Sequence, residues 1–217
     1  MVPMIAALAL LSLCQEKFPV EDHAWLRYKP GSYIKNRLQF ESGGQNTEGI
    51  QKLTLKEVNG DDYVISDDST LSGLATQPNL YSSGNAVKSG TETLSVAGKE
   101  VACTVWKAMG KKNGEPTETR FWIPEGKKNP VRVAFKQKDA EGEMTAVSLD
   151  DKITALGRVF TCAKLEGKIR TNGLEGTLTA WLCQELPSSQ VRMDLVLKTD
   201  NGEVKIRVEA LETHAAK

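Results

Sequence analysis

The sequence contains only two histidines, His23 near its start and His214 near its end. A Ser-His-Asp or Cys-His site would have to be built on His23, and no nucleophile motif accompanies it. The HExxH and CxxC motifs are absent, the later cysteines lack zinc-ligand spacing, and no glycine-rich loop precedes a helical pattern. We therefore expect a non-enzymatic protein with no catalytic, metal or cofactor site.

An excess of charge of one sign is also missing. Lys and Arg together number 28, as do Asp and Glu, so the formal net charge is zero. Without a basic stripe to neutralise phosphates, nucleic acid is not an expected partner. The charges alternate with apolar residues along the chain, which is more typical of the solvated face of a sheet than of a binding surface.

The first thirteen residues are apolar, but this run is too short to cross a membrane, so we expect no transmembrane segment. It resembles the apolar region of a signal peptide without the usual charged start, which predicts export to the periplasm or the outside. Cleavage after Cys14 would leave Gln15 as the first residue. Alternatively, lipidation of Cys14 would anchor the protein to a membrane, since 11–14 resembles a lipobox. A third alternative is that 1–14 belongs to the fold.

Residues 94–212 contain one unit written twice. Four features of the first copy return after 59 residues: Gly98 and Gly157, Cys103 and Cys162, Asn113-Gly114 and Asn172-Gly173, Trp122 and Trp181. Such self-similarity indicates repeated structural units. Each unit, 94–152 and 153–212, reads as four antiparallel strands. Asn-Gly supplies the two positive φ angles of a type I′ hairpin turn, and period-2 alternation marks the later strands.

The second hairpin makes a prediction about register. If Asn172-Gly173 is a two-residue turn, Cys162 faces Cys183 on a rung where a cross-strand disulfide is sterically allowed. In the first copy Cys103 faces Pro124 instead. Three alternatives stay open: both cysteines are free core residues, Cys103 pairs with Cys162, or β-bulges at 167 and 176 shift the register.

Residues 15–93 precede the repeats. Asp22 is expected to cap a short helix whose Trp25 packs onto the sheet as a plug. Hairpins follow over 33–65, and the polar segment 67–93 is interpreted as a surface connection or, alternatively, a lid. The last residues, 213–217, are expected to fray.

The run from Trp25 to Tyr33, with its Lys-Pro-Gly-Ser sequence, resembles the opening of a group of secreted proteins of unknown function common in planctomycete-type bacteria. In that group a Gly and a Cys lead to a hairpin and a Trp, as in the units described above. The resemblance covers the chain to about Leu211 and implies export without implying an activity. More distantly, the architecture is similar to the LolA-like lipoprotein carriers, a fold-level analogy that implies an apolar ligand.

These observations predict an all-β fold, in which an antiparallel meander forms a curved sheet or partly open barrel with N-terminal hairpins and one short N-terminal helix. The first functional hypothesis is an exported protein that binds an apolar or lipid-like ligand on the concave face of the sheet. The alternative is an envelope structural or protein-interaction module without a small ligand. Under the first hypothesis, the residues that line the cavity are Val101, Cys103, Val105, Trp122, Phe160, Cys162 and Trp181.

Overall fold

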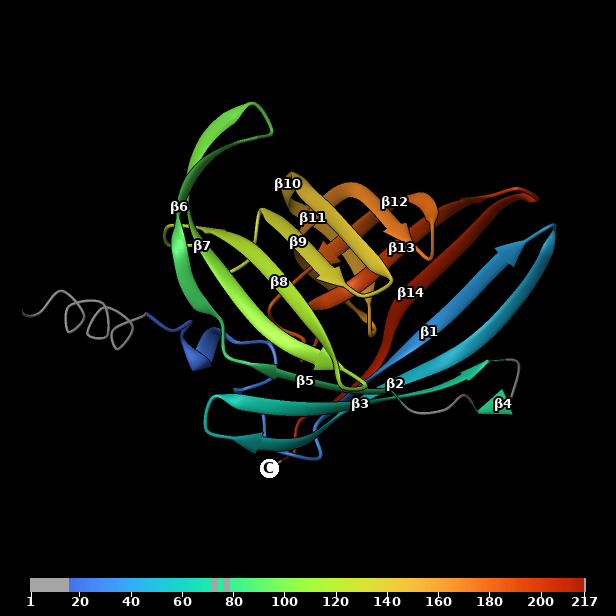
Figure 1. Ribbon diagram of the computed structural model, residues 1–217, viewed down its shortest axis with the longest axis horizontal. Helices are drawn as coiled ribbons and strands as arrows, with labels where there is room; N and C mark the ends of the chain where they lie inside the picture. Colours follow the sequence, from blue (N-terminus) through green and yellow to red (C-terminus); the bar gives the residue numbers. More distant parts are fainter. Residues whose placement is uncertain (1–15, 72–73, 76–78, 217) are drawn as a thin grey trace, which may run out of the picture.

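The structure is a computed structural model that describes residues 16–71, 74–75 and 79–216, so the predicted signal segment and Cys14 lie outside the described residues. It is almost entirely β-structure (Figure 1). The strands are β1 (Tyr33–Ser42), β2 (Gln45–Asn59), β3 (Asp62–Leu71), β4 (Leu74–Ala75), β5 (Asn79–Gly84), β6 (Val87–Val96), β7 (Lys99–Lys112), β8 (Glu115–Pro124), β9 (Arg132–Gln137), β10 (Ala140–Ala155), β11 (Arg158–Thr171), β12 (Leu174–Leu182), β13 (Gln190–Thr199) and β14 (Gly202–His214).

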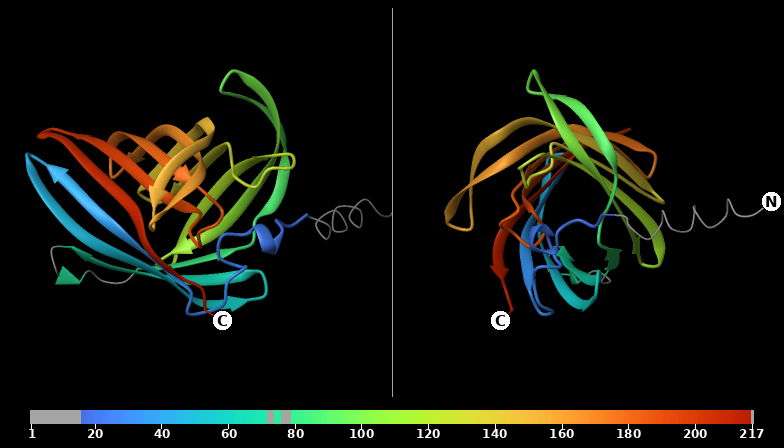
Figure 2. Two further views of the ribbon diagram at one scale, coloured as in Figure 1. Left: turned by 180° about the vertical axis from the view of Figure 1, so that it is seen from behind. Right: turned by 90° about the vertical axis from the view of Figure 1, so that its left-hand side faces the viewer.

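Twelve of these strands form a closed antiparallel barrel in meander order. The ring runs through β1, β2, β3 and β5, continues from β7 to β14, and closes where β14 pairs with β1. Figure 2 shows the ring in its right-hand view. The all-β prediction is therefore confirmed, and the barrel is fully closed. Closure gives every strand of the ring a partner on both sides, which removes the exposed edges of an open sheet.

The two repeats form two consecutive stretches of this ring with the same strand order. The first supplies β7 to β10 and the second supplies β11 to β14, each as a four-stranded meander. Both Asn-Gly pairs adopt the positive φ angles expected of their turns, 50° and 86° for Asn113-Gly114 and 49° and 79° for Asn172-Gly173. The predicted strand count and turn type of the repeat are confirmed.

The predicted registers are also confirmed. Cys103 faces Pro124, and in the second hairpin the pairing runs without a shift from Thr171–Leu174 to Ala163–Leu182. The alternative of β-bulges at Gly167 and Gly176 is wrong, because neither position shifts the register of its hairpin. These glycines instead permit close strand approach, since a Cβ at Gly167 would overlap the carbonyl oxygen of Glu143.

The N-terminal segment packs against the barrel, as Figure 2 shows. Trp25 is buried and contacts the apolar core, which confirms its predicted role as a plug. The expected helix is only the three-residue 3-10 turn Val20–Asp22. Asp22 is the last residue of this turn and not the N-cap of a helix. His23 takes the capping role: its Nδ1 accepts hydrogen bonds from the backbone N–H groups of Trp25 and Leu26, at 3.1 and 3.2 Å.

Two sequence predictions about irregular segments are wrong. Most of 67–93 is strand, because β5 pairs with both β3 and β7 and β6 pairs with β7. At the C-terminus, β14 continues to His214, which pairs with Tyr33, and the backbone N–H of Ala216 donates to Ser32 Oγ. In both segments, partners that are distant in sequence satisfy the backbone of residues that look polar and irregular locally. Among the described residues, no helix is long and apolar enough to cross a membrane.

Candidate functional site

A cavity of about 380 Å³ lies inside the barrel. Its lining comes from eight strands that are consecutive in the ring, from β13 and β14 through β1, β2, β3 and β5 to β7 and β8. Paired residues of neighbouring strands share a face of a sheet, as do residues two apart, so the Leu53–Asp67 and Ile65–Tyr81 pairs present their side chains on one face. The volume lies within the range of small-ligand sites. We take this cavity as the candidate functional site because its lining is drawn from so many strands of the ring.

One wall of the cavity carries a chain of polar side chains. Asn36 donates its amide to Gln51, and Gln51 donates its amide to Asp67, each at 3.0 Å. The hydroxyl of Ser69 donates to the other carboxylate oxygen of Asp67, also at 3.0 Å. Asn36 and Asp67 are only 3% and 5% exposed. Buried polar groups need such partners, and a chain of them fixes the orientation of each member.

Tyr81 extends this polar wall. Burial, together with the negative charge of Asp67 and a hydrogen bond to it, raises the pKa of Tyr81 to about 12. The phenol is therefore neutral at physiological pH and acts as a hydrogen-bond donor. The ammonium group of Lys112 lies 5.5 Å from the centroid of its ring. The wall thus combines amide, carboxylate and phenol groups.

The remaining lining mixes polar side chains with four apolar ones. Leu53 and Ile65 flank the polar groups on β2 and β3, while Met193 and Val208 face them from β13 and β14. Ser188, in the loop between β12 and β13, also borders the cavity. A lumen that offers both polar and apolar side chains suits a ligand that has both an apolar body and a polar group.

The seven residues expected to line a cavity lie elsewhere. Cys103, Val105 and Trp122 are buried in one apolar cluster, and Val101 packs against it. Phe160 and Cys162 are buried in a second cluster, against which Trp181 packs. None of the seven lines the lumen cavity. These residues of the repeat therefore pack in two separate apolar clusters. The polar wall comes from strands that precede the repeat and contain no recognisable sequence motif.

Each repeat carries a further arrangement that its sequence motif only partly reveals. Trp122 donates its indole N–H to Glu92 at 2.6 Å, and the guanidinium of Arg132 lies 4.6 Å from the centroid of the same indole. Arg132 also contacts Glu92, at 3.4 Å. We call this set of Trp, carboxylate and Arg a Trp brace.

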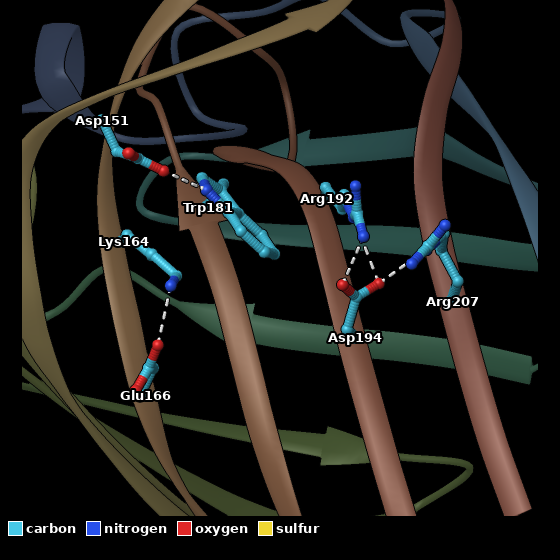
Figure 3. Close-up of polar contacts among 7 residues, drawn as sticks. All are labelled: Asp151, Lys164, Glu166, Trp181, Arg192, Asp194 and Arg207. Atoms are coloured by element: carbon cyan, nitrogen blue, oxygen red, sulfur yellow. Dashed lines mark hydrogen bonds and ion pairs between the residues drawn. The ribbon is translucent and has the colours of Figure 1, made fainter.

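The second Trp brace is similar, but its Arg binds a second carboxylate instead of the one that accepts the indole N–H (Figure 3). Trp181 donates to Asp151 at 2.5 Å, and Arg192 lies 5.0 Å from the indole centroid. Arg192 and Arg207 both bind Asp194, at 2.5 and 2.9 Å. Burial alone would raise the pKa of Asp194, but these two guanidinium groups outweigh it and lower the pKa. The brace thus ties β10, β12, β13 and β14 together across the sheet.

The sequence contained a signal for the braces. Glu92 precedes Asp151 by 59 residues, the same spacing as the other repeated positions. The repeat therefore begins before Leu94, and β6 corresponds to the second half of β10. In keeping with this, Glu92 faces Cys103 and Asp151 faces Cys162 across their hairpins.

The three described cysteines are buried and have free thiols. Cys162 and Cys183 contact each other through a side-chain hydrogen bond, which raises the pKa of Cys162 and lowers that of Cys183 to about 7. Burial also raises the pKa of the Cys103 thiol, together with the nearby carboxylate of Glu92. The predicted disulfide between Cys162 and Cys183 stays a prediction, and the proximity that it requires is present.

Within the residues that the structure describes, no three His, Cys, Asp or Glu side chains gather as metal ligands. His23 is committed to the plug, where its ring also contacts Phe18 and Tyr63 at centroid distances of 6.3 and 5.2 Å. Burial, and secondarily the charge of Arg27, lower the pKa of His23 to about 4. A neutral imidazole whose Nδ1 accepts backbone hydrogen bonds has a structural role.

No family model matches the chain, and no curated protein matches its sequence. Among solved structures, the chain is similar to a protein of Bacteroides fragilis described as a "putative exported protein with YmcC-like fold". The match has 12% identity and a TM-score of 0.39, and it covers 92% of this chain and 100% of that one. At this identity and score, the likeness adds nothing to the functional argument. The resemblances to the planctomycete-type group and to the LolA-like carriers stay predictions.

Proposed function

We propose that this chain is an exported, non-enzymatic binding protein that holds a small amphipathic ligand inside its barrel. The observation that carries the proposal is the lumen cavity of about 380 Å³, whose lining combines a chain of polar side chains with apolar ones. The apolar N-terminal run supports export. The proposed ligand site is therefore the lumen between β2, β3 and β13, whereas the sequence-based hypothesis placed it at the repeated Trp and Cys residues.

The polar and apolar side chains of the cavity would contact different parts of the ligand. Leu53, Ile65, Met193 and Val208 would contact an apolar segment, whose transfer from water drives binding. A hydroxyl, amide or carboxylic acid group would meet the polar wall around Gln51, where donors and acceptors are already oriented. Such preorganised groups provide specificity because the side-chain ordering is already complete before binding.

The test is fluorescence titration of the purified chain with a dansyl-labelled fatty acid, followed by native mass spectrometry of the complex. Met193→Trp places a larger side chain in the lumen and is expected to weaken binding at least tenfold. Met109→Trp is the matched control, because Met109 is 51% exposed, and it should bind as the parent chain does. Circular dichroism and thermal melting of both variants establish that each one is folded.

If Met193→Trp unfolds the barrel, Gln51→Leu provides a second variant, since it keeps a similar volume and removes the amide from the polar wall. It is expected to reduce affinity for the acid more than affinity for the matching dansyl-labelled alkane. Binding that is equal in the parent chain and in the folded lumen variants would overturn the proposal. Absence of binding by the parent chain would also overturn it and would favour the alternative of an envelope interaction module.

A further inference from the structure

Cys162 and Cys183 meet at the end of the second repeat's hairpin. The register that pairs Ala163 with Leu182 places these cysteines opposite each other on the next rung. Counted from the Thr171–Leu174 pair that closes the turn, this rung is of the non-hydrogen-bonded type, where facing side chains lie closest. A cross-strand disulfide is sterically allowed on a rung of this type.

We propose that Cys162 and Cys183 are an oxidisable pair, and that their disulfide fixes the loop that holds the N-terminal plug. The two side chains are 0% and 3% exposed and already contact each other. Cys103, the other described cysteine, faces Pro124 and belongs to a different apolar cluster. The proposal therefore excludes a bond between Cys103 and Cys162, and it does not rest on the proposed ligand.

The chemistry needs an oxidant, and we assign this role to a low-molecular-weight disulfide or a thiol oxidase of the export compartment. Cys183 is the attacking group, because the hydrogen bond from Cys162 lowers its pKa to about 7. Its thiolate attacks the disulfide of the oxidant and releases one thiol. Cys162 then loses its proton, attacks the mixed disulfide and releases the second thiol, so two protons and two electrons leave the protein. Because both sulfurs are buried, exchange takes place during folding or local opening.

The loop that follows Cys183 explains why the bond would matter. The guanidinium of Arg27 donates to the carbonyl oxygens of Gln184 and Leu186, and Tyr28 Oη donates to the carbonyl of Glu185 at 3.3 Å. These contacts hold the plug segment on the loop. Ser188, in the same loop, borders the lumen cavity. A bond at Cys183 therefore restrains both the plug and one edge of the cavity.

The experiment is refolding of the full chain in glutathione buffers from fully reducing to fully oxidising, followed by blocking of free thiols and tryptic mapping. Oxidation should link 159–164 to 171–192, the tryptic peptides that contain Cys162 and Cys183. Cys103, in 100–107, should stay alkylatable. The bond closes a loop of about twenty residues, so the melting temperature should rise by about 5–10 °C. Hydrogen exchange at 25–28 should slow at the same time.

Cys103→Ala is the matched control and should leave the link and the rise in melting temperature unchanged. Cys183→Ala should abolish both the link and the rise in melting temperature. If this variant fails to fold, mapping of the parent chain still decides the question. The proposal is overturned if the oxidised chain links Cys103 to either partner, or if both thiols remain free after oxidative refolding. A link that forms without slower exchange in the plug would overturn the role of the loop.

Discussion

Trp181 donates its indole N–H to the carboxylate of Asp151 at 2.5 Å, across three strands of one sheet. The first repeat reproduces this bond between Trp122 and Glu92. The same distance in sequence, thirty residues, separates donor and acceptor in both copies. The repeat is therefore a repeat of contacts as well as of strands, and each copy supplies one Trp brace to the wall of the barrel.

Removal of the acceptor should destabilise the barrel. Asp151→Ala leaves the partly buried Trp181 N–H without its carboxylate, and we expect a loss of about 1–2 kcal/mol in the free energy of unfolding. Asp150→Ala is the control, because the neighbouring Asp150 is exposed, and its effect should stay within about 0.5 kcal/mol. Urea unfolding measures both.

A double-mutant cycle with Trp181→Phe separates the hydrogen bond from other effects. Trp181→Phe removes the indole N–H, so Asp151→Ala should cost less in that background than in the parent chain. Equal costs in the two backgrounds would contradict a direct contribution of the bond to stability.

The strands and the register of the repeat could be predicted from the sequence because its Asn-Gly turns depend only on neighbouring residues. Asn172-Gly173 selects the turn, the turn sets the register, and the register places Cys162 opposite Cys183 without reference to the rest of the chain. No local sequence pattern predicts the closure of the barrel. It depends on β5 pairing with both β3 and β7, and the short β5 segment contains no alternating pattern.

The site was missed for a related reason. Asn36, Gln51 and Asp67 lie on three strands, and each one alone resembles an ordinary polar residue of a half-exposed strand. Only the closed ring brings them together around a cavity. The functional hypothesis placed Trp122 and Trp181 in a ligand cavity because they repeat. Their repetition reflects a shared structural role in the Trp braces.

Glycine at position 167 is expected to be essential for the close approach of β10 and β11. A Cβ there would overlap the Glu143 carbonyl oxygen and lie 2.6 Å from the Met144 Cα, both on the neighbouring strand. Gly167→Ala must push two hydrogen-bonded strands apart, so we expect a loss of about 3 kcal/mol or more, or failure to fold.

The matched control is Gly157→Ala. Gly157 has a φ of 72° in an open turn, and nothing lies within 4 Å of a Cβ built there. The cost should be about 1 kcal/mol, from backbone strain alone. Chemical denaturation of the two variants provides the comparison, and a Gly167→Ala chain as stable as Gly157→Ala would show that the strands can separate freely.

The plug should make stability depend on pH through His23. Its pKa is about 4 in the folded chain against 6.5 for the free side chain, so the unfolded state binds the proton more readily. His23 therefore contributes stability above pH 6.5, and this contribution falls as the pH drops from 6.5 to 4. The shift corresponds to about 3 kcal/mol at the lower end. Unfolding free energies measured at several pH values in this range should show the decline.

His23→Asn tests the assignment because the Asn side-chain oxygen can still accept the backbone hydrogen bonds of Trp25 and Leu26. This variant should lose less stability than the parent chain between pH 6.5 and 4. His214→Gln, at an exposed position on β14, should keep the full decline. Carboxylates that titrate in the same range are common to all three chains and cancel in the difference. If His23→Asn and the parent chain decline in parallel, the imidazole accepts its proton equally well in the folded and unfolded states, and the plug contributes no pH dependence.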